Sequence, residues 1–348
     1  MKKLVTLILA LVLAFSFSAV GFAETAYSNI EGEIYWIGKM YEGDGWIGIT
    51  DGAKLAAKEM GVKANFTYPE GGEMDVSGQI DLVENAINAK AAAICLAPND
   101  SNALIDVAQK VKDAGIPLIM YDTALADPTY QSAFISYDFY KQGVMAAQAL
   151  GNKLGATGGT VAVINATAGN EAHMNRENGF IDTIKAEYPQ ISIVGETQYC
   201  NNDSVTAMNM TYDLATAHPD LTAIYAANSM CVEGVAPAVE ALNSDIIVVA
   251  CDTSDAIVQY VKDGIILFTS SCFAPAIGYL SVVAAVKLLA GEELTDIEWN
   301  GQTFALNKET MTYDSGVYGI DASVVADESM TYIFRPLTWF DTYKGYEW

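Results

Sequence analysis

Short apolar runs that alternate with amphipathic segments constrain the fold of this chain more than any other feature. The runs are nearly continuous in Val, Ile, Leu and Ala, which is the pattern of parallel strands that are buried on both faces. The repeated strand–helix order predicts an α/β fold, a doubly wound parallel sheet with right-handed crossovers. The runs occupy residues 34–38, 91–97, 117–121, 160–164, 222–227, 246–251 and 266–270.

The segments between the runs have the period and the length of helices. Residues 76–89 and 101–114 each carry one apolar stripe with polar residues opposite. Asp100 or Ser101 is the expected cap of the second of these helices, and Gly115 follows its end.

The strand–helix series occurs twice, and 348 residues exceed the size at which one core usually stops growing. We therefore expect two doubly wound lobes joined by a hinge. Residues 24–137 plus 273–300 are assigned to the N-terminal lobe, and 138–272 plus 301–348 to the C-terminal lobe and its tail. Residues 276–289 are interpreted as an extra covering helix, and the tail is expected to pack across both lobes. Short crossings between the lobes would suit hinge closure.

The first residues have the features of a secretory signal peptide. Lys2 and Lys3 precede an apolar run over 4–20, and small residues follow at Gly21 and Ala23. An uncleaved membrane anchor is the alternative because the run approaches the length of a span. No basic stop-transfer cluster follows, so we expect cleavage of residues 1–23 and a soluble protein in the periplasm or at the exterior of the cell envelope.

The charge of the chain excludes some partners. It has 43 acidic residues against 18 Lys plus Arg, a net charge of -25. Such a surface repels phosphate backbones and anionic lipid heads, so we expect no nucleic-acid partner and no role at a membrane surface. Most of the carboxylates are interpreted as solubilising.

The five cysteines favour neither a disulfide framework nor a metal site. Their number is odd and no C-x-x-C pair occurs. Cys95 and Cys251 lie inside apolar runs and are interpreted as small core residues. At least one thiol is unpaired, which hints at a reducing or anaerobic habitat.

Polar residues follow the predicted strands directly. Lys39, Asp122, Asn228, Asp252 and Ser271 stand at these positions. Ligands of open α/β sheets bind in the crevice outside the carboxyl ends of the strands. Carboxylates accept from vicinal hydroxyls and amides both donate and accept, which are the needs of a buried polyol. The alternative is that Asp and Asn only begin turns or cap the next helix.

Two further residues are candidates for the same crevice. The planar fork of Arg176 suits neighbouring ring and hydroxyl oxygens, but Arg176 could also be a surface ion-pair partner of Glu177 or Asp182. Trp46 precedes a helix expected over 47–60 and could stack on a sugar ring, although core packing is the commoner use of Trp.

Catalysis finds no support in the sequence. There are two histidines, His173 and His218, and His218 lies in an expected turn after a helix with no nucleophile beside it. No G-x-S-x-G, no phosphate-binding G-x-x-x-x-G-K-[ST] and no metal-spaced set occurs. We therefore expect a protein that is not an enzyme and holds no cofactor and no metal.

The chain resembles the periplasmic sugar-binding proteins of ABC importers, in the ribose-binding type I group, over nearly everything after the signal peptide. The motifs that carry the resemblance are Asp-Gly-Ala at 51–53, Ala-Pro-Asn-Asp-Ser at 97–101, Ala-Gly-Ile-Pro-Leu-Ile-Met-Tyr-Asp at 114–122, Ala-His-Pro-Asp at 217–220, Ala-Asn at 227–228, Val-Ala-Cys-Asp at 249–252 and Lys-Asp-Gly at 262–264. Ligand contacts of the family then fall on Asp122, Arg176, Asn228 and Asp252.

The chain also departs from the ribose binders at other positions. Lys39 replaces a small hydroxyl residue, and Trp46 alone remains of paired phenylalanines. Asn202 occupies the position of a stacking aromatic residue in the ribose binders, and Cys272 the position of a hinge glutamine. Tyr137 replaces a small residue at the lobe crossing. The resemblance to the ribose binders therefore does not predict ribose as the ligand.

A sub-group resemblance leaves a second function open. Lys39, Asp-Val-Ser-Gly-Gln-Ile at 75–80 and the ending at 332–348 resemble rhamnose-binding and autoinducer-2-binding proteins. Autoinducer-2 binders carry an Asp-Gln pair where Ala172 and His173 stand, and a Pro in place of Ala227.

Taken together, these features predict a monomeric solute-binding protein that delivers a monosaccharide, deoxysugar or polyol to a membrane ABC permease. A receptor for autoinducer-2 is the alternative, and an acidic sugar stays open because Lys39 and Arg176 are both cationic. The predicted ligand-binding residues are Lys39, Trp46, Asn99, Asp122, Tyr137, Arg176, Asn202, Asn228, Asp252 and Cys272.

Overall fold

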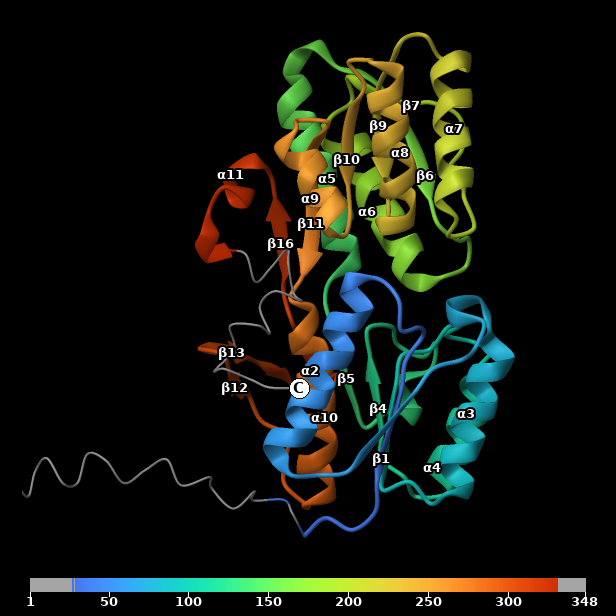
Figure 1. Ribbon diagram of the computed structural model, residues 1–348, viewed down its shortest axis with the longest axis vertical. Coiled ribbons are helices and arrows are strands. Elements are labelled where there is room, and N and C mark those ends of the chain that lie inside the picture. The colour runs from blue at the N-terminus through green and yellow to red at the C-terminus, as the bar shows by residue number, and fades with distance from the viewer. Residues whose placement is uncertain (1–26, 28, 331–348) are drawn as a thin grey trace, which may run out of the picture.

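The chain forms two lobes, each built on a sheet that helices cover on both faces (Figure 1). The computed structural model describes residue 27 and residues 29–330. The predicted fold, two doubly wound α/β lobes, is confirmed. The predicted signal peptide and the end of the tail lie outside the described residues. Within the described part, every helix is too short or too polar to cross a bilayer.

The sheet of the N-terminal lobe is parallel except at one edge, where β14 and β15 are antiparallel. Its strands, in spatial order, are β2 (Ala64–Thr67), β1 (Ile34–Ile37), β3 (Ala93–Leu96), β4 (Leu118–Tyr121), β5 (Ala133–Ser136), β15 (Thr312–Asp314) and β14 (Leu306–Asn307). One face packs on α2 (Asp44–Met60) and α10 (Ala274–Leu289), and the other on α3 (Val76–Asn88) and α4 (Ile105–Asp113). Alternate strand residues point to the two faces, so that Trp36 and Ile37 lie in different cores.

The C-terminal lobe repeats this plan. Its strands, in spatial order, are β7 (Ile191–Ile193), β6 (Gly159–Asn165), β9 (Leu221–Ala226), β10 (Ile247–Ala250), β11 (Ile266–Cys272) and β16 (Val317–Ile320), with β8 (Gln198–Tyr199) beside β6. Helices α5 (Phe139–Leu154) and α6 (Glu171–Glu187) pack on one face. The other face carries α7 (Ser204–Ala217), α8 (Ser229–Leu242) and α9 (Asp255–Lys262).

The remaining elements are short. A hairpin of β12 (Ile297–Trp299) and β13 (Gln302–Phe304) follows α10. One turn of helix, α11 (Ala322–Val325), follows β16, and single 3₁₀ turns lie at η1 (Gly72–Met74), η2 (Pro128–Tyr130), η3 (Gly155–Thr157) and η4 (Glu328–Met330).

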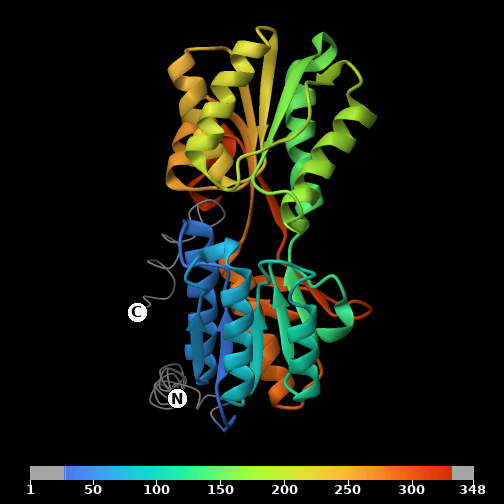
Figure 2. The same ribbon diagram turned by 90° about the vertical axis from the view of Figure 1, so that its right-hand side faces the viewer.

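The chain passes between the lobes at residues 137–138, 272–273 and 315–316 (Figure 2). The expected boundary at residue 300 is wrong for residues 302–314. There β14 and β15 extend the N-terminal sheet, because Thr312–Asp314 pairs with β5. The C-terminal lobe resumes only with β16, which pairs with β11. As expected, α10 covers the N-terminal sheet, and its residues 274–286 are all buried.

Two helix starts differ from the sequence prediction. Asp100 accepts hydrogen bonds from the N–H groups of Asn102 and Ala103, each at 2.8 Å, and so holds a separate turn before α4, which begins at Ile105. Helix α2 begins at Asp44, so Trp46 lies in its first turn and not before the helix.

Helices α2 and α10 approach so closely that glycine is required at their contact. A Cβ atom on Gly278 would overlap the carbonyl oxygen of Ile49. We expect Gly278→Ala to destabilise the protein by about 1–3 kcal/mol, because an overpacked helix contact forces backbone shifts. Gly45→Ala is the matched control, since Gly45 lies in the same helix pair with open space around it. Urea unfolding checks both, and equal stabilities of the two variants would contradict the packing argument.

Candidate functional site

Two aspartates with an unusual backbone conformation stand at the ends of equivalent strands. Asp122 follows β4 with φ 62°, and Asp252 lies two residues after β10 with φ 74°. The Asp122 N–H donates to Ile135 O at 2.8 Å, and the Asp252 N–H to Ser270 O at 2.7 Å, so each is bonded to the neighbouring strand. A non-glycine residue in the left-handed region costs about 1 kcal/mol or more. In both lobes, this strained backbone conformation directs the carboxylate beyond the end of the sheet.

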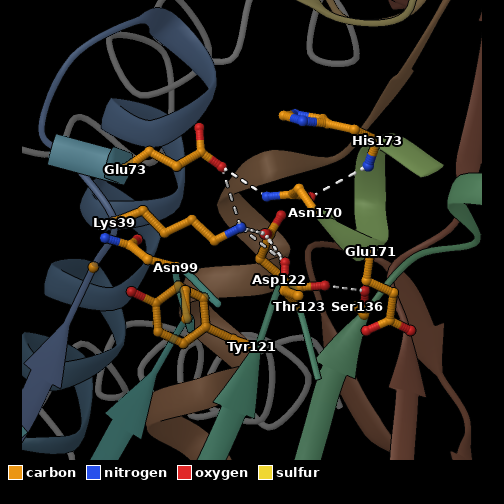
Figure 3. Close-up of polar contacts among 12 residues, drawn as sticks. Lys39, Glu73, Asn99, Tyr121, Asp122, Thr123, Ser136, Asn170, Glu171 and His173 are labelled. Carbon is orange, nitrogen blue, oxygen red and sulfur yellow. Dashed lines mark hydrogen bonds and ion pairs between the residues drawn. The ribbon is translucent and has the colours of Figure 1, made fainter. Parts of the chain in front are cut away.

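In the N-terminal lobe, Asp122 forms a buried ion pair with Lys39, which follows β1 (Figure 3). The Lys39 Nζ lies 3.1 Å from Asp122 Oδ2 and 3.6 Å from Glu73 Oε1, and donates to Thr123 Oγ1 at 2.9 Å. Burial alone would lower the pKa of Lys39, but Asp122 and Glu73 outweigh it and raise that pKa. The site therefore holds a charged ammonium group whose neighbours are carboxylates.

The ring of Trp46 lies beside this ion pair. Its centroid is 5.5 Å from Lys39 Nζ, a cation–π distance. Trp46 is partly buried and packs against the core of the N-terminal lobe. The core-packing interpretation of Trp46 therefore holds for part of its surface, and stacking on a sugar ring stays a prediction.

Asn99 forms hydrogen bonds to the segment that carries Glu73. Its Nδ2 donates to Gly72 O at 3.0 Å and more weakly to Asp75 O at 3.5 Å, and its N–H donates to Gln79 Oε1 at 2.7 Å. Asn99 thus fixes the η1 turn that carries Glu73. Its Oδ1 is buried and has no hydrogen-bond partner among the described residues, so one acceptor is left for a ligand or a water molecule.

In the C-terminal lobe, Arg176 of α6 binds Asp252 with two parallel hydrogen bonds, at 2.9 Å and 2.7 Å. The other donors of Arg176 reach Gln142 Oε1 at 2.7 Å, Ala227 O at 3.1 Å and Tyr137 OH at 3.1 Å. Arg176 is buried; burial opposes its charge, but Asp252 prevails and raises the pKa of the guanidinium well above its usual value.

The surface alternative for Arg176 is wrong. Glu177 accepts hydrogen bonds from Asn165, Thr197 and Tyr199 inside the C-terminal lobe. Asp182 accepts from the hydroxyl group of Tyr140. Neither carboxylate pairs with Arg176.

Asn228 precedes Ser229, whose N–H donates to Asp252 at 3.2 Å, and Asn228 forms a hydrogen-bonded pair with Asn202. Asn228 caps α8, its Oδ1 accepting from Cys231 N–H at 3.0 Å, and its Nδ2 donates to Asn202 Oδ1 at 2.8 Å. The capping interpretation of Asn228 is therefore right, and it coexists with a position at the strand ends. Asn202 is held in the left-handed region, with φ 57°.

Tyr137 and Cys272 occupy two of the crossings between the lobes. The Tyr137 ring lies 4.4 Å from that of Phe139, centroid to centroid, and its hydroxyl meets Arg176. Cys272 ends β11 and is partly buried, and burial raises the pKa of its thiol. The predicted residues thus gather at the facing strand ends of the two lobes, with Asn99 one layer behind.

Sequence reasoning missed the residues that link the lobes. Glu73 Oε1 accepts from Asn170 Nδ2 at 3.2 Å, and Ser101 Oγ approaches Glu171 Oε2 at 3.5 Å. Glu73 lies in a loop before a helix and Asn170 and Glu171 at the start of α6, so none of them follows an apolar run directly. A cavity of about 210 Å³ lies between the lobes, and of Glu73, Asn170, Ser101 and Glu171 it is Glu171 that lines it. The full lining is Asp122, Thr123, Ala124, Phe134, Ser136, Tyr137, Asp138, Phe139, Tyr140, Glu171 and Asn175.

A larger hollow, of about 650 Å³, lies elsewhere. Its walls include Asn243, Asp245 and Ile265, at the amino ends of β10 and β11. None of the predicted site residues lines it. We place the site at the carboxyl ends, where the charged side chains converge.

His173 is buried beside the site and uncharged. Burial, followed by the nearby charges of Arg176 and Lys39, lowers its pKa to about 3. Its Nδ1 is 2.8 Å from Thr167 Oγ1. No group of three or more His, Cys, Asp or Glu in the described part of the chain has the geometry of a metal site.

Comparison with known proteins identifies the class of protein that this geometry belongs to. Residues 34–293 match the family described as periplasmic binding protein domain, and the chain belongs to that family. The predicted kinship with type I periplasmic sugar-binding proteins is confirmed, and these proteins are binding proteins, not enzymes.

Individual relatives agree with this. The D-ribose/D-allose-binding protein of Pseudomonas aeruginosa is 30% identical over 70% of this chain and 77% of its own length. An ABC transporter solute-binding protein of Agrobacterium vitis with bound D-fucose is 28% identical, with a TM-score of 0.78 over 87% of this chain and 100% of that one. The solute-binding protein of Actinobacillus succinogenes with bound D-allose is 25% identical, with a TM-score of 0.74 over 85% of this chain and 99% of that one.

The Arg176–Asp252 pair generates a prediction for stability. Asp252→Asn leaves a buried guanidinium without its counter-charge, and we expect a loss of about 3 kcal/mol. Arg176→Met should lose less, because the Asp252 side chain is 28% exposed and can be hydrated. The double variant should lose about 1–3 kcal/mol less than the sum of the two. Urea unfolding of the ligand-free variants measures the cycle, and strict additivity would show that the pair is not coupled.

His173 generates a prediction for pH. Its pKa is depressed from 6.5 to about 3 in the folded protein, so its contribution to stability is complete above pH 6.5 and is lost as the pH falls toward 3. Between pH 7 and pH 5 the unfolded state gains about 2 kcal/mol from protonating this residue. The stability lost over that interval should therefore be about 2 kcal/mol smaller in His173→Gln than in the wild type. Urea unfolding at both pH values tests this, and parallel losses would refute it.

Proposed function

We propose that this protein captures a monosaccharide, deoxysugar or polyol in the crevice between its lobes and delivers it to the membrane permease of an ABC importer. The observation that carries the proposal is the convergence of Asp122 and Asp252 from opposite lobes, each beside a buried cation. The relatives named above that bind D-ribose, D-allose or D-fucose support the sugar class. Like its family, the protein is expected to act in the periplasm; we propose that it does so as a monomer.

The proposed ligand contacts follow from what each group can donate or accept. Asp122 and Asp252 accept from hydroxyls, Lys39 and Arg176 donate to ring and hydroxyl oxygens, and Asn228 does both. Each ligand hydroxyl left buried and unpaired would cost about 1–3 kcal/mol, which is why a polyol needs a polar lining of this density. The carbon faces of the sugar can pack against aromatic rings, and those near the crevice are Trp46, Tyr137 and Phe139.

The second candidate, a receptor for autoinducer-2, is not favoured. It shares Lys39 and Asp122 with the sugar proposal, and those residues do form an ion pair. Of the relatives reported above, one is named a D-ribose/D-allose-binding protein, and the other two are solute-binding proteins with bound D-fucose and D-allose. His173 is buried and bonded to Thr167, at a position where an autoinducer-2 receptor would need a ligand-binding amide.

A thermal-shift screen with D-ribose, D-allose, D-arabinose, D-fucose, D-tagatose and L-rhamnose tests the sugar proposal. A ligand at 100 times its dissociation constant stabilises the folded state by about 2.7 kcal/mol, which moves the melting temperature measurably. At least one of these sugars should do so, and calorimetry should then give its Kd.

Asp122→Asn should weaken that sugar about tenfold or more, because a charged acceptor is lost. Asp245→Asn, an exposed aspartate at the larger hollow, is the control and should bind as the wild type does. A reduced affinity in Asp245→Asn with an intact Asp122→Asn would move the site to the larger hollow. No response to any sugar would refute the proposed function.

A further inference from the structure

Glu73 is placed by a turn that the rest of the N-terminal lobe holds rigidly. It lies in η1, after Gly72, whose φ is +63°. Asn99 donates to Gly72 O from one side, and Asp75 accepts from Gly71 N–H at 3.3 Å from the other. The side chain of Glu73 is only 13% exposed. The carboxylate is therefore presented at a fixed position and is not a mobile surface charge.

The contacts of Glu73 cross from one lobe to the other. One oxygen, Oε1, accepts from Asn170 Nδ2 at 3.2 Å, and the other, Oε2, accepts from Asn202 Nδ2 at 3.4 Å. Both asparagines belong to the C-terminal lobe, at the start of α6 and before α7. On its own lobe the carboxylate lies 3.6 Å from Lys39 (Figure 3).

The two asparagine side chains are oriented for this contact by their own partners. Asn170 Oδ1 accepts from His173 N–H at 3.3 Å, and Asn202 Oδ1 accepts from Asn228 Nδ2 at 2.8 Å. Because each amide oxygen is already engaged, each amide NH₂ group must point the other way, and both point at Glu73. The amide groups of Asn170 and Asn202 are therefore pre-oriented to donate to the Glu73 carboxylate from the opposite lobe.

The charges at the crevice are unequal. Its cations, Lys39 and Arg176, each have a carboxylate of their own, Asp122 and Asp252. Two further carboxylates are in excess of these pairs: Glu73, beside Lys39, and Glu171, in the wall of the cavity between the lobes. A negatively charged ligand in this partly desolvated crevice meets that excess charge, whereas an uncharged ligand does not.

We propose that Glu73 is a charge-selective clasp: it holds the lobes together through Asn170 and Asn202 and excludes ligands that carry a carboxylate or phosphate. This inference rests on the proposed function and narrows its ligand class to uncharged sugars. It decides against an acidic sugar, which the two cations taken alone had left open.

Competition with uronic acids tests the selectivity. In Glu73→Gln one of the two excess charges is lost while the side-chain volume is kept. D-galacturonate and D-glucuronate are titrated against the sugar of the screen that binds best. We expect their inhibition constants to fall about tenfold in Glu73→Gln relative to the wild type. Glu70→Gln, an exposed glutamate of the same loop, is the matched control and should not change them. Unchanged inhibition constants in Glu73→Gln would overturn the selectivity.

Small-angle scattering of the ligand-free proteins tests the clasp itself. In Glu73→Gln the new side-chain amide can accept from one asparagine only, because its NH₂ group faces the other donor. The lobes of this variant should therefore separate, and its radius of gyration should rise. Glu70→Gln should scatter as the wild type does, and identical profiles for all three proteins would overturn the clasp. If no sugar binds the wild type, the proposed function fails, while scattering still decides whether Glu73 joins the lobes.

Discussion

The buried pairing of Arg176 with Asp252 is the interaction on which the arrangement of the C-terminal lobe depends. A guanidinium out of water is costly unless its donors are satisfied. Here they reach Asp252, Ala227 O, Gln142 and Tyr137. These partners come from the ends of β9 and β10, from α5 and from a crossing between the lobes. One side chain therefore fixes the relative positions of four segments at the mouth of the sheet.

The N-terminal lobe also contains a buried cation whose donors must be satisfied, but this cation is the compact ammonium group of Lys39. The Lys39 ammonium group takes Asp122, Thr123 and Glu73 as neighbours, and a tetrahedral group with three donors suits partners that are spread around it. The two aspartates have the same left-handed backbone in both lobes. The two lobes thus carry equivalent carboxylates at their facing strand ends but neutralise them with different cations. The planar guanidinium of Arg176 pairs with Asp252, and the flexible ammonium group of Lys39 pairs with Asp122.

The sequence predicts those residues of the site whose positions follow from a local pattern, namely the residues at the ends of apolar runs. Strands buried on both faces are short, nearly continuous apolar runs, so the sequence predicts β1, β3, β4, β6, β9, β10 and β11, and with them the side chains at their ends, such as Asp122 and Asp252. The strands β2, β5 and β7 are not among the runs. Asn99 was predicted as a ligand contact, but it also supports the η1 turn. Its role depends on Gly72 and Gln79, which are 27 and 20 residues away in the chain. Glu73 and the pairing of Thr312–Asp314 with β5 leave no periodic signal, because both are set by contacts between distant segments.

The order of segments in the lobes has a consequence for synthesis. The N-terminal sheet takes its edge strands from Leu306–Asn307 and Thr312–Asp314, and one of its covering helices, α10, starts only at Ala274. The continuous stretch 138–272 already contains β6, β9, β10 and β11 with their helices. A chain that emerges from the ribosome amino end first completes this central stretch while the beginning of the polypeptide still lacks its partners. The amino-terminal half of the molecule, although it is made first, therefore lacks a covering helix and two strands of its sheet until the central stretch has been made.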